Sequence, residues 1–475
     1  MTHLEAQPLA PPARSVFSRR VGAATPNQVL AIVCVGICLA NLDLFIVNVA
    51  LPNVSRDFGD ANMEDLSWVL NGYAIVYAAF LVFFGRLVER YRRDLSFLAG
   101  VALFTLASAA CVAAQGVWGL VAFRVLQAAG AALMTPTSLG LLLASFPPEK
   151  RGAAVRAWTA IGGFAAALGP LAGGLLLTLS WRWIFLVNVP AGLLAIWLGW
   201  RMLPHVPGHE VKRPDPWAAL MVTGGIAALV LAIVKFNDWG WRSPSELATL
   251  AVAVLLLGAF SRHCLTSANP FIDPVLFRVR PYTGAVLVMA PYSAAFGAML
   301  LSVALWEQAE WGWTALQTGL VIMPGPLLVP TTSLLLSARL ISRFGSSAVV
   351  AAGILFFAFG LAVWATAVET TPDALAILGG MIPTGIGVGL TFPTLMGVAA
   401  ASLPPSSFST GSGVINMIRQ AALAVGVAIF IAIVGAPGTP LQRLYAFREG
   451  WWVMALVVLL GLIPTFVLIR RKRAA

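Results

Sequence analysis

Long runs of apolar residues, nearly free of charged side chains, recur along the whole chain and constrain its fold more than any other feature. A helix needs about 20 mostly apolar residues to cross the roughly 30 Å hydrocarbon core of a bilayer. Only 10% of the 475 residues are charged and 59% are hydrophobic, whereas soluble chains carry about 25% charged residues. The sequence therefore predicts an all-α membrane protein with fourteen segments: 28–52, 66–87, 95–114, 117–145, 153–179, 183–203, 216–236, 246–264, 282–306, 315–338, 346–367, 373–399, 410–435 and 449–469.

Basic residues fall mostly on one side of these segments. When both termini are placed in the cytoplasm, 22 of the 30 lysines and arginines lie in cytoplasmic loops and tails, six lie outside, and two lie within segments. Cytoplasmic loops of membrane proteins carry such an excess. We therefore expect both termini to be cytoplasmic, and the net charge of +11 needs no nucleic-acid partner to explain it. No cleavable signal peptide is expected in residues 1–27, a cytoplasmic tail.

Two short patterns occur twice in the chain. Arg-Leu-x-x-Arg-aromatic begins at Arg86 and again at Arg339, an offset of 253 residues. Gly-x-x-Leu-x-x-Pro-Thr begins at Gly130 and again at Gly387, an offset of 257. Internal repeats are typical of transporters. We expect two six-helix bundles and a linker that carries two extra helices, with the divisions 28–203, 204–264 and 265–470, followed by a cytoplasmic tail at 471–475.

Several motifs make the chain resemble the major facilitator superfamily, and specifically its fourteen-span drug:proton antiporter branch. The first segment reads Leu-Asp-Leu-Phe-Ile-Val-Asn-Val-Ala-Leu-Pro over residues 42–52, and the fifth carries Gly-Pro-Leu-Ala-Gly-Gly over 169–174, similar to the branch's antiporter motif. The fourth begins its motif with Arg124 and continues to Gln127. The resemblance implies the major facilitator fold, with a substrate cavity between two bundles near the bilayer midplane, a proton as the coupling ion, and a monomer.

Three ionisable side chains lie well inside predicted segments: Asp43, Arg124 and Arg419. A charge at bilayer depth costs at least about 2.5–3.5 kcal/mol, so each needs a partner or water. Asp43 and Arg124 lie seven to nine residues from the outer ends of their segments, which puts both roughly 10–14 Å deep at 1.5 Å per residue. We therefore expect them to face a common cavity.

Two interpretations of Asp43 and Arg124 follow. In the first, Asp43 takes up the transported proton, and Arg124 favours its ionised form when the two are close. Protonation would then be coupled to the rocking of the two halves. In the second, the two residues form a fixed ion pair, or Asp43 hydrogen-bonds to helix backbone. The resemblance implies that both residues matter without settling which carries the proton.

Four residues are candidate substrate contacts. Arg419 either binds an anionic substrate or forms a hydrogen bond between packed helices. Glu307 ends a segment beside Trp306, and is either a solvated charge on the outer rim or a carboxylate that takes a second proton or attracts a cationic compound stacked on Trp306. Asn48, within the first-segment motif, is the fourth candidate.

The resemblance also implies gating roles for two motifs. The loop after the second segment departs from the family pattern Gly-x-Leu-Ala-Asp-Arg-x-Gly-Arg-Lys, since Glu89 replaces Asp, Arg92 replaces Gly and Asp94 replaces the last basic residue. The Gly-Pro pattern of the fifth segment allows close helix approach and a kink, and the resemblance implies that it seals the closed cavity. The predicted gating residues are Gly85, Glu89, Arg90, Arg93, Gly169, Pro170, Gly173 and Gly174.

Enzymatic and metal chemistry find little support in the sequence. His205 and His209 have the spacing of helical metal ligands, but Pro207 and Gly208 between them interrupt a helix. No Gly-x-x-x-x-Gly-Lys-Ser/Thr phosphate loop is present. We therefore expect no metal, no enzyme activity and no cofactor besides the coupling proton.

The expected function is proton-driven export of lipophilic, often cationic compounds, by alternating access across a bacterial cytoplasmic membrane. One alternative is a dedicated exporter of a single endogenous metabolite, siderophore or lipid, which needs the same apolar cavity and protonatable carboxylate. Another is a non-transporting membrane sensor or membrane enzyme, against which the intramembrane Asp43 and Arg124 count.

Overall fold

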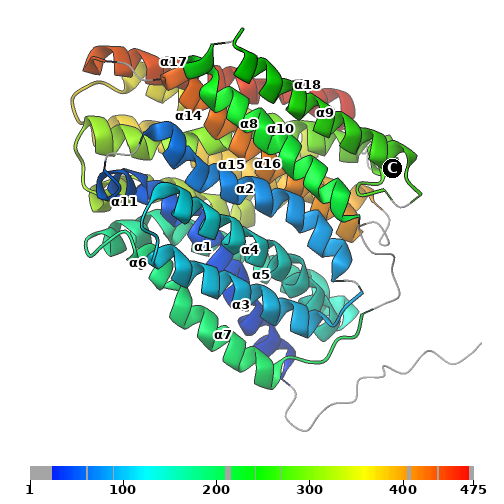
Figure 1. Cartoon of the computed structure of the whole chain (residues 1–475). Coiled ribbons are helices and arrows are strands. Elements are labelled where there is room, and N and C mark those ends of the chain that lie inside the picture. The colour runs from blue at the N-terminus through cyan, green and yellow to red at the C-terminus, as the bar shows by residue number, and fades with distance from the viewer. Residues whose placement is uncertain are drawn as a thin grey trace, which may run out of the picture.

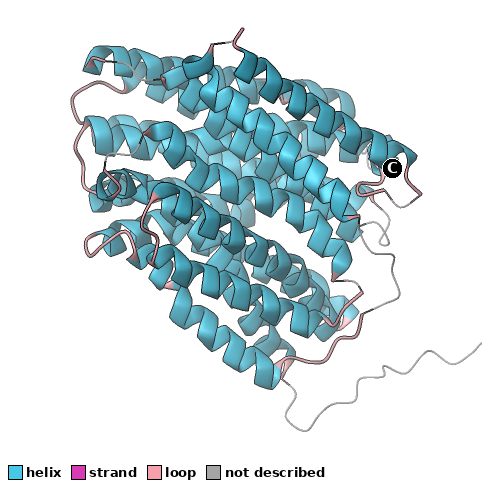
Figure 2. Cartoon of the chain, viewed as in Figure 1, coloured by secondary structure: helices cyan, strands magenta, loops and turns pink. Residues whose placement is uncertain are grey.

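The protein is a bundle of helices that run along the same general direction in the computed structural model (Figure 1). The structure describes residues 24–59, 62–88, 90–208, 215–240, 242–268, 270–403, 408–435 and 438–469. No strand occurs within these ranges, and loops are short (Figure 2). The all-α class predicted from the apolar segments is confirmed.

The helices fall into an N-terminal set, two central helices and a C-terminal set. The N-terminal set is α1 (Pro26–Asp57), α2 (Met63–Leu87), α3 (Arg93–Val112), α4 (Val117–Ser145), α5 (Pro148–Leu177), α6 (Trp183–Leu186) and α7 (Asn188–Met202). The central helices are α8 (Pro216–Trp239) and α9 (Pro244–Thr266). The C-terminal set is η1 (Pro274–Arg278), α10 (Arg280–Leu305), η2 (Trp306–Glu310), α11 (Ala315–Ile322), α12 (Pro324–Thr332), η3 (Ser333–Ser337), α13 (Ala338–Phe344), α14 (Ser346–Ala367), α15 (Ala374–Ser402), α16 (Phe408–Val434), α17 (Pro440–Leu459) and α18 (Leu462–Leu468).

Twelve helices of the described part are long and apolar enough to cross a membrane. A thirteenth crossing results if the stretches Ala315–Thr332 and Leu335–Phe344, which meet at a 42° bend, form one span. Prolines at 324 and 330 explain the irregular course there, because proline removes a helical hydrogen bond. The remaining predicted segment, 153–179, lies almost entirely within the 30-residue helix α5. The number fourteen itself stays a prediction.

Local sequence signals fix several helix ends. Thr25 and Gln28 form a capping box at the start of α1, where Pro26 occupies the first turn. Gly240 ends α8 with φ of 74°, and Gly345 separates α13 from α14 with φ of 85°. These positive φ values favour glycine, because a Cβ would clash with the backbone.

The internal repeat corresponds to two equivalent helix crossings. Gly130 of α4 packs so closely on α3 that a Cβ there would lie 2.5 Å from the Phe104 nitrogen. Gly387 of α15 packs in the same way on α14, where a Cβ would lie 2.8 Å from the Phe357 nitrogen. The offsets between these partners are 257 and 253 residues, the two offsets found in the sequence. The repeated motif therefore reflects a repeated backbone contact.

The two halves pack on each other through α2 and α16, and they also touch at one end of the bundle. The Gln308 side-chain amide donates to the Val49 carbonyl over 3.0 Å. Gly174 of α5 lies so close to α11 that a Cβ would be 2.7 Å from the Ala315 carbonyl oxygen. The distribution of basic residues predicts that this end lies outside the cell. The described chain starts and finishes at the opposite end (Figure 1), where the Ala24 nitrogen donates to the carbonyl of Met202.

The central helix α8 packs on both halves. It contacts α2 of the N-terminal half and α16 of the C-terminal half, as well as its neighbour α9. Lys235 of α8 forms an ion pair with Glu64 of α2 and a second one with Asp238 at 3.0 Å. The Lys235 hydrogen bond lowers the pKa of the Asp238 carboxyl. The extra pair of helices is thus attached through α8.

Candidate functional site: a buried polar network in the N-terminal half

Asp43 and Arg124 form a buried ion pair at the centre of the N-terminal half. Asp43 comes from α1 and Arg124 from α4, and both side chains have no accessible surface. The Arg124 Nη1 group donates to Asp43 Oδ2. The two residues that the sequence places at a common depth are therefore in direct contact.

Two amide side chains complete the network. Gln127 accepts from Arg124 Nη1 over 2.6 Å and donates to Asp43 Oδ1 over 2.8 Å. Asn188 at the start of α7 donates to the same Asp43 oxygen over 3.2 Å. The Ser108 hydroxyl of α3 accepts from Gln127 over 2.8 Å. Two helices, α4 and α7, therefore donate to the carboxylate on α1, and Ser108 links α3 to the same network.

Aromatic rings cover this network. The Arg124 guanidinium carbon lies 4.1 Å from the centre of the Tyr73 ring and 5.8 Å from that of Phe185. Arg124 Nε also donates to the Val69 carbonyl over 3.3 Å. The prediction that Asp43 and Arg124 face a cavity is therefore wrong for this conformation, since the pair is enclosed within one half.

Sequence reasoning did not assign roles to Gln127 and Asn188. Both stood in the motifs that carry the family resemblance, and Gln127 lies one helical turn after Arg124. Side chains three residues apart share a helix face, so that spacing was the available signal for Gln127. Asn188 had no comparable signal, because its approach to Asp43 depends on how α7 packs.

Asn48, the predicted substrate contact on α1, forms a hydrogen bond within its own helix. Its side-chain amide donates to the Leu44 carbonyl of its own helix over 3.0 Å, and the residue is buried. Such a bond one turn back along a helix satisfies the amide donor locally. The structure does not bring Asn48 into the Asp43 network.

Glu307 and Trp306 are buried side by side in the π-helical turn η2. Both have 0% relative exposure, so Glu307 is not the solvated rim charge that was one interpretation of the sequence. Neither Glu307 carboxylate oxygen makes a well-aligned hydrogen bond in the described residues, and the Thr318 hydroxyl is the polar group that interacts with this carboxyl. The Trp306 ring packs against Trp311, Phe447 and Trp451 with centroid distances of 5.0–6.5 Å. In this conformation Trp306 belongs to the core and offers no open face to a ligand.

Arg419 lies at the junction of the two halves. It is carried by α16, which packs on α2, and its guanidinium carbon is 5.7 Å from the centre of the Phe392 ring on α15. The residue is half-buried, and no ion pair to it occurs in the described residues. The structure does not connect Arg419 to the Asp43 network.

The glycines of the antiporter-like motif let α5 pack closely on two different helices, α1 and α11. A Cβ at Gly169 would lie 2.7 Å from the Phe45 Cβ, and one at Gly173 would lie 3.0 Å from Ile46, both on α1. Gly174 instead faces α11 of the other half. Pro170 lies within α5. The expected close helix approach is observed, and its sealing role stays a prediction.

The loop between α2 and α3 is held by the segment after α7. The Arg93 nitrogen donates to the Val206 carbonyl over 3.1 Å. Arg92 donates to Asp94 over 2.6 Å, which raises the pKa of the Arg92 guanidinium, and His205 Nδ1 lies 3.1 Å from the same carboxylate.

The remaining predicted gating residues of this loop differ in their surroundings. Arg93 contacts Gly140 of α4, whereas space is open around Gly85 and Arg90 is exposed. Glu89 lies outside the described residues. Their gating roles are not tested by these contacts.

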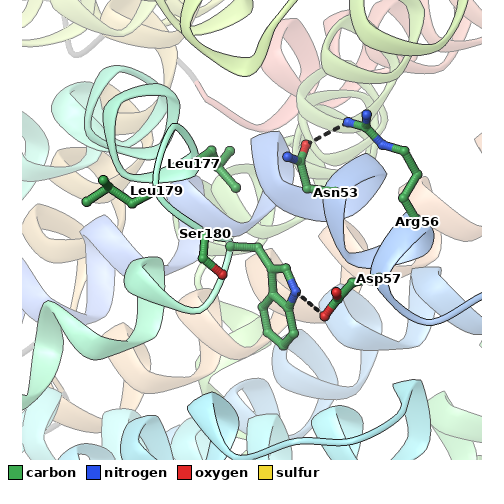
Figure 3. Close-up of a pocket in the computed structure, with 7 residues that line it drawn as sticks. Asn53, Arg56, Asp57, Leu177, Leu179 and Ser180 are labelled. Atoms are coloured by element: carbon green, nitrogen blue, oxygen red, sulfur yellow. Dashed lines mark hydrogen bonds between the residues drawn. The ribbon is translucent and has the colours of Figure 1, made fainter.

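A shallow pocket of about 370 Å³ lies at the outer end of α1 (Figure 3). Asp57 is its charged centre, accepting from the Trp181 indole over 2.9 Å and from Arg182 over 2.7 Å. The other lining residues are Asn53, Arg56, Leu177, Leu179 and Ser180. All belong to the N-terminal half, so this pocket is not the cavity expected between the halves.

Comparisons with known proteins agree with this architecture. The model of a family described as Major Facilitator Superfamily matches residues 33–306 and 285–475. The tetracenomycin C resistance and export protein of Streptomyces glaucescens is 30% identical over 416 residues, covering 86% of this chain and 75% of that protein. The multidrug resistance protein Stp of Mycobacterium tuberculosis is 32% identical, covering 86% and 76%.

A solved structure shares the fold at low sequence identity. An auto-inhibited peptide transporter of the POT family superposes with a TM-score of 0.68 at 17% identity, covering 95% of this chain and 98% of that one. This likeness concerns the fold alone. The family match and the relatives show that the chain belongs to the major facilitator superfamily, in its drug:proton antiporter branch, and is a membrane transporter of small molecules rather than an enzyme.

Proposed function

We propose that this protein exports small lipophilic, often cationic compounds in exchange for protons, as a monomer in the bacterial cytoplasmic membrane with both termini inside. The observation that carries the proposal is the enclosed network around Asp43. A carboxylate at membrane depth is costly and is retained where it serves a proton or substrate pathway. Here the carboxylate holds together α1, α4 and α7 of one half.

Protonation of Asp43 would change this network directly. A neutral carboxyl no longer balances the Arg124 charge, and its hydroxyl must find an acceptor among side chains that now donate to it. Arg124 would keep Gln127 and the Val69 carbonyl as partners. The helices that meet at Asp43 would therefore repack, and α1 transmits the change to α5, which contacts the opposite half. Such a two-state element can couple proton binding to alternating access.

The names of two relatives support export, but one indicates a single substrate and the other indicates several. One is named for resistance to a single compound, tetracenomycin C, and the other for multidrug resistance. A multidrug exporter is our first candidate. A dedicated exporter of one endogenous compound is the second, because a relative of similar identity carries the name of one compound.

The test measures proton release from acid-inside inverted vesicles on addition of ethidium and a panel of unrelated lipophilic cations. Wild type is expected to dissipate the gradient with several compounds, and Asp43→Asn with none. Asp57→Asn, an exposed carboxylate on the same helix, is the matched control and should behave as wild type. Response to one compound alone supports the dedicated exporter.

A folding control keeps the result interpretable. Asp43→Asn leaves Arg124 buried without its counter-charge, so the double variant Asp43→Asn/Arg124→Gln, which removes both charges, is assayed beside it. If either folded variant releases protons as wild type does, Asp43 is not the coupling site. If no compound moves protons in the wild type, proton-coupled export is the wrong function and a membrane sensor becomes the better candidate.

A further inference from the structure

Arg419 is a half-buried cation near the middle of the membrane. It precedes Val434, the end of α16, by fifteen residues, which places it roughly 22 Å from that end at 1.5 Å per residue. Tyr77, which interacts electrostatically with Arg419, lies near the middle of α2. Arg419 is therefore far from both membrane surfaces, where a lysine or arginine could extend its charge into water.

Among the described residues, no acidic group neutralises this charge. Within the described ranges no carboxylate lies within 4 Å of Arg419, and its Nε has no hydrogen-bond acceptor. The chain's other intramembrane arginine, Arg124, shows the contrast, since it has Asp43, the Gln127 carbonyl oxygen and the Val69 carbonyl as partners. An uncompensated charge at this depth is costly. Arg419 therefore needs an anion or water from outside the chain.

The surroundings of Arg419 are aromatic and come from both halves. Tyr77 belongs to the N-terminal half and Phe392 to the C-terminal half. The Phe392 ring meets Phe296 at 5.4 Å, and Phe296 meets Phe45 of α1 at 6.1 Å. We refer to Phe392, Phe296 and Phe45 as the aromatic row. It runs from the guanidinium across to the other half.

Arg419 also keeps some accessible surface, unlike the fully enclosed Arg124. An arginine guanidinium presents a planar fork of donors that matches a carboxylate or similar oxyanion. The Tyr77 hydroxyl cannot replace such an anion, because it lies 3.1 Å from the Thr135 hydroxyl, which in turn donates to the Ala131 carbonyl. Tyr77 thus donates its own hydrogen to Thr135.

We propose that Arg419 binds an acidic oxygen group of the exported compound, a carboxylate, sulfonate or phenolate, while the aromatic row contacts its apolar body. This proposal rests on the proposed export function and extends the substrates from lipophilic cations to lipophilic acids. Because the contacts of Arg419 come from both halves, an anion bound there would touch the surfaces that move against each other. Arg419 would then select substrates by charge.

The test uses two probes that share one aromatic skeleton. Anilinonaphthalene sulfonate is anionic, and N-phenyl-1-naphthylamine is its neutral counterpart. Binding of each to the purified protein in lipid nanodiscs is measured by fluorescence titration, with empty nanodiscs subtracted. The variants are Arg419→Gln, Arg419→Lys and Arg201→Gln. Arg201 stacks on Trp197 within α7 of the N-terminal half. Arg201→Gln therefore removes the same charge at a position away from Arg419.

We expect Arg419→Gln to weaken binding of the sulfonate at least ten-fold and to change binding of the neutral probe less than two-fold. The sulfonate affinity of Arg419→Lys should lie between those of wild type and Arg419→Gln, since an ammonium lacks the planar fork. Arg201→Gln should bind both probes as wild type does. Equal sulfonate affinity in wild type and Arg419→Gln, or an equal loss for both probes, overturns the proposal.

A charge-reversal variant covers the case in which Arg419→Gln does not fold. If the charge at this position selects the ligand, Arg419→Glu should lose binding of the sulfonate and gain binding of the cation ethidium. An unchanged preference between these two ligands also overturns the proposal. Failure of the export function is seen separately, as absence of proton-driven transport of any probe in vesicles. Binding selectivity at Arg419 and transport can therefore fail independently.

Discussion

At the scale of single residues, two buried acids stand in opposite surroundings. Asp43 accepts hydrogen bonds from Arg124, Gln127 and Asn188. Glu307 is equally buried, yet its carboxylate oxygens make no well-aligned hydrogen bond within the described part of the chain. Three donors therefore hold the Asp43 side chain in place, whereas Glu307 has no comparable set.

Amide substitution should separate the two acids. Glu307→Gln keeps the size of the side chain and removes no such set of hydrogen bonds, so it should leave the midpoint of thermal unfolding nearly unchanged. Asp43→Asn should destabilise the fold by about 3–5 kcal/mol, because Arg124 loses its counter-charge in the core. Scanning fluorimetry of the purified protein in detergent measures both. Similar losses in the two variants would show that Glu307 has a partner as important to the fold as that of Asp43.

The residue scale also marks the limit of prediction from sequence. Counting residues along a helix gives the depth of a side chain, and depth sufficed to pair Asp43 with Arg124. The direction in which a side chain points depends on how the helix is rotated against its neighbours, and packing decides that. For this reason Asn188 was missed, and Glu307 could not be distinguished from a rim charge.

At the scale of elements, glycines decide how closely helices cross. Most predicted segments became helices near their expected positions, because long apolar runs and capping residues specify them locally. The interruptions of the segment at 315–338 were not predicted, although its prolines offered a signal. The final segment begins at Pro440, nine residues before the predicted start at 449, because a capping box at Thr439 extends the helix into polar sequence.

Alanine substitutions test the repeated crossing. Gly130→Ala and Gly387→Ala each push a Cβ into neighbouring backbone and should cost about 1–3 kcal/mol. Gly119→Ala and Gly397→Ala lie on the same two helices in open space and should be neutral or stabilising by about 0.5–1 kcal/mol. Thermal unfolding of the four variants gives the comparison. A stable Gly130→Ala together with an unstable Gly387→Ala would argue against equivalent crossings.

At the scale of the whole molecule, the two halves are closed against each other at the end marked by Gln308. Gly174 of α5 contributes by letting α11 approach its backbone. Two short patterns that each occur twice in the sequence predicted two related halves. It could not predict which ends of the halves touch, because a transporter's halves change that contact while the sequence stays the same.

Enlarging Gly174 should open this contact. The background is a chain whose four native cysteines are replaced by serine and whose residue 308 is replaced by cysteine. Gly174→Leu forces a side chain against α11. It should therefore increase the rate at which an impermeant maleimide, added from outside, labels the cysteine at position 308. Gly163→Leu, on the same helix with open space around it, is the control. Equal labelling rates in the two variants would mean that Gly174 does not hold the halves together.

The helix α8 has a mechanical consequence for any such opening. It touches α2 in one half and α16 in the other, so it cannot remain fixed to both while they rotate apart. The ion pair between Lys235 and Glu64 fastens it to α2. We therefore expect α8 to move with α2 and to slide along α16 when the halves tilt.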